Sequence, residues 1–168
     1  MAVQRSRFDF PSPHCIDLNV SPADIDAYQH VNNAVYVEWC DRVAWHHSAA
    51  LGLPIERCLE LDRGMAVVRT TIEYLRPALV NDVVTIATWL LPAESRLCVR
   101  RRFQMLRKTD DVTLARAEID YACIVLSSGR PSRWPPEFHA HYAALPAVLA
   151  ALTEKAEVQA EHDQVRTR

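Results

Sequence analysis

One long stretch of the chain, residues 33–51, carries large and mostly apolar side chains at helical spacing. They recur at four-residue steps, with a second row one position further on (Val35, Trp39, Val43, His47 and Leu51; Tyr36, Cys40 and Ala44). The spacing predicts a helix about 30 Å long, which Gly52 and Pro54 end. Because its apolar surface reaches around much of the circumference, we expect the helix to be largely enclosed.

The period changes to two outside this helix. A weak alternation covers 14–20, a short helical turn fits within 53–63, and four longer β-rich runs follow at 64–76, 83–91, 97–105 and 115–125. Polar turns separate them at Asn81-Asp82, at Pro92 to Ser95 and at Thr109-Asp110-Asp111. The last turn is short, so the final two runs are predicted to form an antiparallel hairpin.

The two ends of the chain differ from this central part. Residues 1–13 hold two prolines and no period, which predicts an N-terminal arm. After a loop at 127–136, the chain from Glu137 to about Glu161 is rich in alanine and helical in propensity, with a break at Pro146. We therefore divide the chain into an arm (1–13), a central domain (14–136) and a helical extension with a frayed polar tail (137–168).

This order of elements predicts an α+β fold. One apolar helix cannot stand alone in water, and the simplest arrangement is a sheet curled around it. Such a sheet leaves an edge strand exposed, and pairing with a second copy of the chain is one way to cover that edge.

Composition excludes several functional classes. The 168 residues suit one domain, and a net charge of −2 provides no basic excess for a general nucleic-acid binder. The five cysteines form no C-x-x-C motif, which argues against a zinc or redox site and favours a reduced, cytoplasmic location. No apolar run is long enough for a signal peptide or a membrane span. With only three glycines, a dinucleotide or P-loop phosphate site is not expected.

The densest polar cluster, Asp24 to Tyr36, leads directly into the predicted helix. It holds two carboxylates, an imidazole and three side-chain amides. Asparagine is a preferred helix cap, and the N–H groups of a first helical turn favour negative charge. These residue types also form ordinary turns and caps, so this local pattern alone leaves both interpretations open.

The same run, Asp-x-Asp-x-x-x-His-Val-Asn-Asn-x-x-Tyr, resembles the signature of hotdog-fold acyl-thioesterases, the 4-hydroxybenzoyl-CoA thioesterase family and the related plant acyl-carrier-protein thioesterases. Similar segments follow at Glu73 to Pro77, Asn81-Asp82 and Ser128 to Pro131, so the resemblance covers about 14–140. It implies a hotdog fold, in which a curved antiparallel sheet of about five strands wraps a long central helix. It also implies a homodimer or homotetramer that hydrolyses an acyl-CoA thioester without a cofactor.

The resemblance assigns the catalytic residues. It makes Asp26 the nucleophile or the general base, and it places the N–H that polarises the thioester carbonyl at Asn33. An aspartate is ionised at neutral pH without special tuning, and first-turn N–H groups have no acceptor within the helix. His30 either orients the carbonyl or a water, or fixes the loop. Asn32 is better suited to capping the helix.

Four further residues are candidates for substrate binding. Tyr36 and Asp41 lie one and two turns into the helix and can line an acyl pocket, although core packing and a solvated helix face are the plainer interpretations. Arg130 and Arg133 lie in a loop without acidic neighbours and are candidate contacts for CoA phosphates. The chain departs from the family pattern at Gln29, where many members have glycine.

Two other motifs have simpler explanations. His46 and His47 are adjacent, and neighbouring helical residues point about 100° apart, so no metal site is predicted. Three arginines at 100–102 suggest a phosphate patch. In the predicted hairpin, however, Arg100 and Arg102 lie opposite Asp120 and Glu118, which favours a ladder of cross-strand ion pairs (100 with 120, 102 with 118).

Two other functions compete with hydrolysis. A hotdog hydratase or dehydratase usually needs a histidine and an acid acting on the acyl chain, which the double-aspartate turn fits poorly. A non-catalytic acyl-CoA sensor has no need of a carboxylate beside the thioester, so Asp26 favours the hydrolase.

Overall fold

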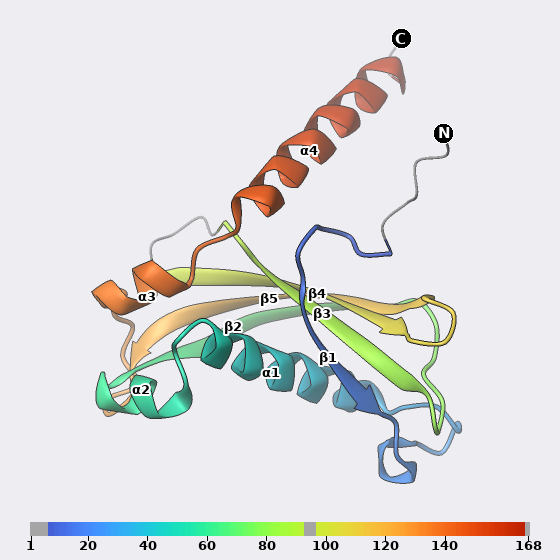
Figure 1. Cartoon of the computed structure of the whole chain (residues 1–168), viewed down its shortest axis with the longest axis horizontal. Helices are drawn as coiled ribbons and strands as arrows, with labels where there is room; N and C mark the ends of the chain where they lie inside the picture. The colour runs from blue at the N-terminus through green and yellow to red at the C-terminus, as the bar shows by residue number, and fades with distance from the viewer. Residues whose placement is uncertain (1–6, 93–96, 167–168) are drawn as a thin grey trace.

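The computed structural model describes residues 7–92 and 97–166, with side chains to residue 157. The helices and strands follow the predicted order (Figure 1): β1 His14–Asn19, the 3-10 turn η1 Pro22–Asp24, α1 Asn33–Ala50, α2 Ile55–Glu60, β2 Arg63–Tyr74, β3 Val83–Leu91, β4 Cys98–Arg107, β5 Thr113–Val125, α3 Pro136–His141 and α4 Pro146–Arg166. Of the predicted turn from Pro92 to Ser95, residues 93–95 lie outside the described part of the chain.

The five strands form one antiparallel sheet in the order β1-β3-β4-β5-β2. The sheet curves over α1, which lies along its concave side (Figure 1). This is the hotdog fold that the sequence predicts, with the helix packed against strands from both halves of the sheet.

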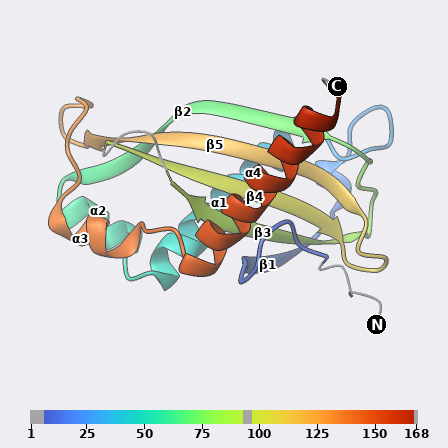
Figure 2. The same cartoon turned by 90° about the horizontal axis from the view of Figure 1, so that it is seen from above.

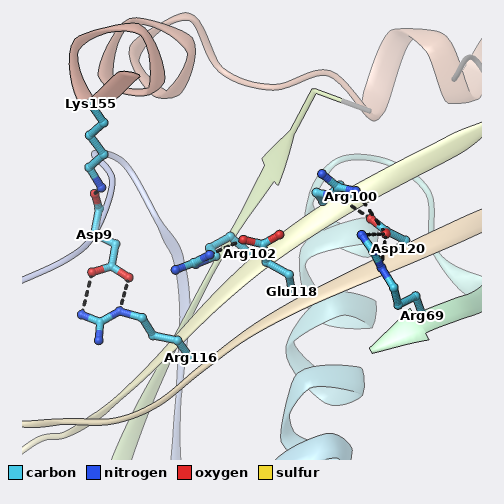
Figure 3. A network of polar contacts seen from close by, with 8 residues as sticks. All are labelled: Asp9, Arg69, Arg100, Arg102, Arg116, Glu118, Asp120 and Lys155. Carbon is cyan, nitrogen blue, oxygen red and sulfur yellow. Dashed lines mark hydrogen bonds and ion pairs between the residues drawn. The ribbon is translucent and has the colours of Figure 1, made fainter. Parts of the chain in front are cut away.

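The hairpin of β4 and β5 explains why the sheet has two different faces. Phe103, Met105 and Ile119 point inward and are buried with α1. On the outer face, Arg100 contacts Asp120 at 2.6 Å and Arg102 pairs with Glu118 (Figure 3). The predicted ion-pair ladder is therefore confirmed, and the polar side chains of this ladder are bound to one another.

The long helix is enclosed on one side only. Tyr36, Trp39 and Val43 are buried against the sheet, whereas Val37 and Trp45 are each 41% exposed. The prediction of a largely enclosed helix is thus wrong for a single chain, because one curved sheet covers a single face of a helix.

Strand β2 is an edge of the sheet and is unusually apolar for one. It pairs with β5, and a bulge between Val67 and Arg69 interrupts the register. Val67 and Val68 are 54% and 60% exposed. The bulge breaks the alternation expected along this strand, so Val68 does not join the core.

Residues just before β1 and the first turns of α4 pack on the outer face of the sheet, and the rest of α4 rises away from it (Figure 1). Phe10, Trp89 and Val148 bring residues before β1, strand β3 and α4 into one small buried cluster. Figure 2 shows α4 crossing above the strands. The predicted break at Pro146 is confirmed, and α4 continues to Arg166, beyond the expected end near Glu161. The three domain boundaries drawn from the sequence stay predictions.

Candidate active site

The loop before α1 is built by its own polar side chains. The carboxylate of Asp24 accepts hydrogen bonds from the N–H and the hydroxyl of Ser21, at 2.7 and 2.8 Å. The carbonyl of Asp24 accepts from the N–H of Asn32 at 2.8 Å. Asp24 therefore ties the beginning of the loop to its end and has a structural function.

Asp26 holds the same loop with one carboxylate oxygen only. Its Oδ1 accepts from the N–H of Tyr28 at 2.8 Å and, more weakly, from the N–H of His30 at 3.4 Å. Its Oδ2 accepts no hydrogen bond from the residues that the structure describes, and the side chain is only partly buried. One oxygen is thus oriented by the backbone while the other is available to react.

The tight turn after Asp26 shows the conformational cost of one departure from the family pattern. Gln29 has a φ of +64°, the left-handed region that favours glycine. The N–H of Gln29 donates to the carbonyl of Asp26 at 3.0 Å, and the N–H of Asp26 donates to the carbonyl of His30 at 2.8 Å. The glycine of many family members suits this conformation, and Gln29 adopts it at some cost.

The first turn of α1 leaves one N–H without an acceptor. Asn32 caps the helix by accepting from the N–H of Ala34 at 2.9 Å, and its carbonyl accepts from the N–H of Val35 at 2.9 Å. The N–H of Asn33 donates to no group in the described residues. This is the donor that the sequence assigns to the thioester carbonyl.

These groups line one open cleft of about 500 Å³. Of the residues predicted from the sequence, the structure brings four together along its wall: Asp26, His30, Asn33 and Tyr36. Asp26, with one carboxylate oxygen unbound in the described chain, and Asn33, with an N–H that has no acceptor there, therefore line the same volume. That combination can deliver a nucleophile or an activated water to a carbonyl whose oxygen is held by the helix terminus.

Tyr36 forms the buried wall of the cleft. Its hydroxyl accepts from the N–H of Ala78 at 3.0 Å, and its ring meets that of Tyr74 edge-on at 5.2 Å. Burial raises the pKa of Tyr36, so the phenol stays neutral. The hydroxyl of Tyr74 donates to the carbonyl of Asn33 at 3.1 Å, which fixes the first helical residue against β2.

The cleft also contains residues that the sequence did not single out, Tyr28 and Arg76. Tyr28 is 84% exposed at the loop tip. Arg76 is exposed, and its NH1 donates to the carbonyl of Leu75 at 2.8 Å. The signal for Arg76 was present in the segment Glu73 to Pro77, which resembled the family but was assigned no function.

Three predicted substrate contacts lie elsewhere in the chain. Asp41 lines a second cavity further along α1. Arg130 and Arg133 are exposed in the loop after β5. Tyr74, which lines the cleft, pairs in the sheet with Ala115 of β5. The loop with the two arginines begins after Val125, ten residues further along β5 and roughly 33 Å from Ala115. Within one chain, neither arginine reaches the Asp26 cleft.

Other chemical groups are poorly placed to act at the cleft. Burial raises the pKa of the thiols of Cys40, Cys58 and Cys123, which keeps them protonated. On the outer face, Arg116 binds Asp9 at 2.7 Å, and Lys155 donates to the carbonyl of Asp9 at 2.6 Å (Figure 3).

Among the described helices, none has the length and apolar character needed to cross a membrane.

Comparison with known proteins finds similarity over most of the chain. The family model described as "Thioesterase-like superfamily" matches residues 20–142. The long-chain acyl-CoA thioesterase FadM of Escherichia coli is 30% identical over 108 residues, which cover 62% of this chain and 77% of FadM.

Two solved structures share the fold. The 1,4-dihydroxy-2-naphthoyl-CoA thioesterase Slr0204 of Synechocystis has a TM-score of 0.70 at 17% identity, with 78% of this chain and 96% of Slr0204 covered. The protein SAV2348 of Staphylococcus aureus, whose structure contains CoA, has a TM-score of 0.71 at 16% identity, with 77% and 81% covered.

Proposed function

This chain belongs to the thioesterase-like superfamily, and we propose that it hydrolyses acyl-CoA thioesters in the Asp26 cleft. One observation carries the proposal. Oδ2 of Asp26 and the N–H of Asn33 both lack a partner in the described chain, and both residues line the same open cleft. FadM and Slr0204, both acyl-CoA thioesterases, support the same class of substrate.

The reaction needs a group that delivers oxygen to the carbonyl carbon. Oδ2 of Asp26 can attack directly, expelling the CoA thiolate and forming a mixed anhydride that water then hydrolyses. Alternatively, Asp26 takes a proton from a water molecule as that water attacks the carbonyl carbon. The free acid and the CoA thiolate then form without a covalent acyl-enzyme intermediate. A thiolate leaves readily, so neither route requires a strong general acid.

Asn33 stabilises the negative charge that develops on the carbonyl oxygen. Losing one well-aimed donor of this kind raises a barrier by about 3 kcal/mol. The donor is a backbone N–H, so replacing the side chain of Asn33 has a smaller effect than replacing Asp26. His30, in the same cleft, orients the carbonyl or the attacking water, and Tyr36 bounds the acyl group.

Arg76 supplies a positive charge to the cleft in this scheme. It lines the cleft, and the one side-chain hydrogen bond that it makes within the described chain goes to the carbonyl of Leu75. Its remaining N–H groups can bind a phosphate of CoA. The cytoplasmic location expected from the sequence remains a prediction.

A homodimer completes this site. The edge strand β2 and the adjoining face of α1 expose a patch of large apolar side chains (Val37, Trp45, Val67, Val68). Two-fold antiparallel pairing of β2 strands covers this patch and places the start of one β2 beside the end of the other. It thereby brings the partner's Arg130 and Arg133 toward the cleft, where they can act as the predicted phosphate contacts.

The test is thiol release from a panel of acyl-CoAs, followed with a thiol-reactive dye. Asp26→Asn should lower kcat/KM by about 10²- to 10⁴-fold, because the amide cannot act as base or nucleophile. The loop should survive, since the amide oxygen still accepts from Tyr28. Asp111→Asn, which removes a carboxylate from the distant hairpin turn, serves as the control and should retain full activity.

Two outcomes contradict the proposal. Full activity of Asp26→Asn would refute the mechanism. Tight binding of acyl-CoAs without thiol release across the panel would favour a sensor instead.

A further inference from the structure

A second cavity lies at the opposite end of α1 from the Asp26 cleft. It has a volume of about 50 Å³ and lies between the later turns of α1, α2, α3 and the first residues of β2 and β4. Tyr121 of β5 and Tyr142, just after α3, also line it. Its wall is largely apolar, and it shares no lining residue with the Asp26 cleft. The most unusual part of the wall is an arginine, Arg101.

Arg101 is a buried cation, with only 2% of its surface exposed. Its NH1 lies 2.8 Å from Nδ1 of His47, and its NH2 donates to the hydroxyl of Ser48 at 2.9 Å. The guanidinium also lies 5.6 Å from the centre of the Tyr142 ring. The bonds to His47 and Ser48 use two of its five N–H groups, and the Tyr142 hydroxyl is a further polar neighbour. No described aspartate or glutamate forms an ion pair with it.

The neighbours of Arg101 are neutral. A guanidinium only donates hydrogen bonds, so Nδ1 of His47 must be the acceptor and its proton sits on Nε2. Burial, with the nearby charge of Arg101, lowers the pKa of His47 to about 3. Burial raises the pKa of Tyr121 and Tyr142, whose phenols stay protonated. The groups that contact Arg101 therefore carry no negative charge, and no ion pair among the described residues balances its positive charge.

An uncompensated buried charge is costly, and proteins normally pair such groups. Here Tyr121 lines the same cavity, and its hydroxyl makes no hydrogen bond to any part of the chain that the structure describes. Arg101 and Tyr121 thus offer hydrogen-bond donors to one small volume, and the one described carboxylate in its wall, Asp41, is exposed and forms no ion pair with Arg101. An anion is the ligand that this arrangement suits.

The remaining wall selects among anions. Ala44, Met65, Val67 and Val99 are apolar and suit an alkyl group. Asp41, exposed in the same wall, disfavours a doubly charged phosphate. A water needs about 10–15 Å³ of such volume, so 50 Å³ holds a carboxylate with a short alkyl stem.

We propose that the Arg101 cavity binds an alkyl carboxylate, with the carboxylate on Arg101 and Tyr121 and the alkyl part against the apolar wall. This chemistry has two sources. One is a free short-chain acid. The other is the far end of a dicarboxylic acyl group whose thioester occupies an Asp26 cleft of the dimer, and this second source rests on the proposed function.

The first experiment tests the carboxylate without any hydrolysis. Sodium butyrate is titrated to about 50 mM at constant ionic strength against sodium chloride, because so small a ligand is not expected to bind tightly. The wild type should show a saturable rise in melting temperature. Arg101→Met should weaken binding about tenfold or more, and Tyr121→Phe severalfold. Arg69→Met, which removes a cation from the outer face, is the matched control and should bind like the wild type.

The second experiment separates the two sources. Adipoyl-CoA and hexanoyl-CoA have acyl chains of equal length and differ in the terminal carboxylate. If the cavity receives the end of the acyl group, the wild type should prefer adipoyl-CoA, and Arg101→Met should lower the ratio of the two kcat/KM values about tenfold or more. Butyrate binding with an unchanged ratio assigns the cavity to a free acid.

The proposal is overturned if butyrate stabilises the wild type no more than chloride does and the adipoyl preference is absent or unaffected by both variants. If Arg101→Met does not fold, the wild-type titration and Tyr121→Phe still decide, because Tyr121→Phe keeps the ring in the core. Failure of every acyl-CoA to release thiol would contradict the proposed function, whereas butyrate binding would still support this cavity.

Discussion

The two ends of α1 hold charge in opposite ways. At the start of the helix, Asp26 is partly exposed, and the backbone of its own loop binds one carboxylate oxygen. At the end of the helix, Arg101 is buried and is held by His47 and Ser48, which lie more than fifty positions away in the chain. The first charge is placed by local turns, and the second by long-range packing.

This difference separates activity from stability. A carboxylate in contact with solvent costs little to keep charged, so changes at the Asp26 end should alter turnover more than folding. A buried guanidinium depends on every hydrogen bond that it makes, so changes at the Arg101 end should alter folding. Four predictions test this contrast, beginning with the largest expected effect on stability.

Ser48→Ala should cost about 2–3 kcal/mol of unfolding free energy. The hydroxyl of Ser48 accepts from Arg101 at 2.9 Å and contacts the hydroxyl of Tyr142 at 3.0 Å, and both groups are buried. The melting temperature should fall by about 4–10 °C. Ser128→Ala, on an exposed loop, should change it little, and equal effects of the two variants would contradict the contrast.

Stability should decrease as the pH falls below about 6.5. The pKa of His47 in the folded chain is lowered to about 3, chiefly by burial. Between that value and about 6.5, the unfolded chain therefore binds a proton at His47 and the folded chain does not. The full contribution is present above the unfolded pKa and is lost progressively toward pH 3, at no more than about 1.4 kcal/mol per pH unit. The ring of His14, stacked on His47, has a pKa lowered mainly by burial and adds to the same trend.

Urea unfolding between pH 7 and pH 4.5 measures this dependence. His47→Gln should flatten it, because the amide oxygen can still accept from Arg101 but does not titrate. His139→Gln, an exposed change on α3, should keep the wild-type slope. A wild-type slope in His47→Gln would show that another group controls the pH dependence.

Asn32→Ala should cost about 1 kcal/mol, the usual value for a lost helix cap. It removes the bond from the N–H of Ala34 and loosens the turn that aims the N–H of Asn33. We therefore also expect a severalfold loss of kcat/KM, which Ser48→Ala should not produce. Asn19→Ala, at the exposed end of β1, is the control for both measurements. A loss of stability without any loss of activity would contradict the catalytic role proposed for the start of α1.

Gln29→Gly should have the smallest effect, a stabilisation of a few tenths of a kcal/mol. Glycine relieves the left-handed strain at φ +64° but adds conformational freedom to the unfolded chain, and the two nearly offset. Gln29→Val, a β-branched residue at the same φ, should instead destabilise the loop. Thermal unfolding of both variants gives the comparison, and a stable Gln29→Val would argue against strain at this position.

Much of the site was predictable because it is local. Asp26, His30, Asn33 and Tyr36 lie within eleven consecutive residues, and a turn followed by a helix start leaves them few ways to separate. The alternation in β4 and β5 predicted the ion-pair ladder for a similar reason, since a short turn sets the register of a hairpin.

The positions of other residues could not be predicted because they depend on distant segments. The alternation of Val99 and Phe103 already places Arg101 on the inward face, yet the adjacent arginines suggested an outer patch. Arg130 and Arg133 follow the end of β5 that lies far from the cleft, which no local pattern reveals.

The sequence by itself determined the hotdog fold and the catalytic candidates, because hydrophobic period, turn residues and one contiguous motif act over short separations. Only the tertiary structure decided that Asp26 keeps one free oxygen, that α1 and β2 leave an apolar face uncovered, and that Arg101 is buried beside a cavity. Those outcomes depend on which segments meet across the curved sheet, and burial is a property of the packed chain rather than of any single stretch of it.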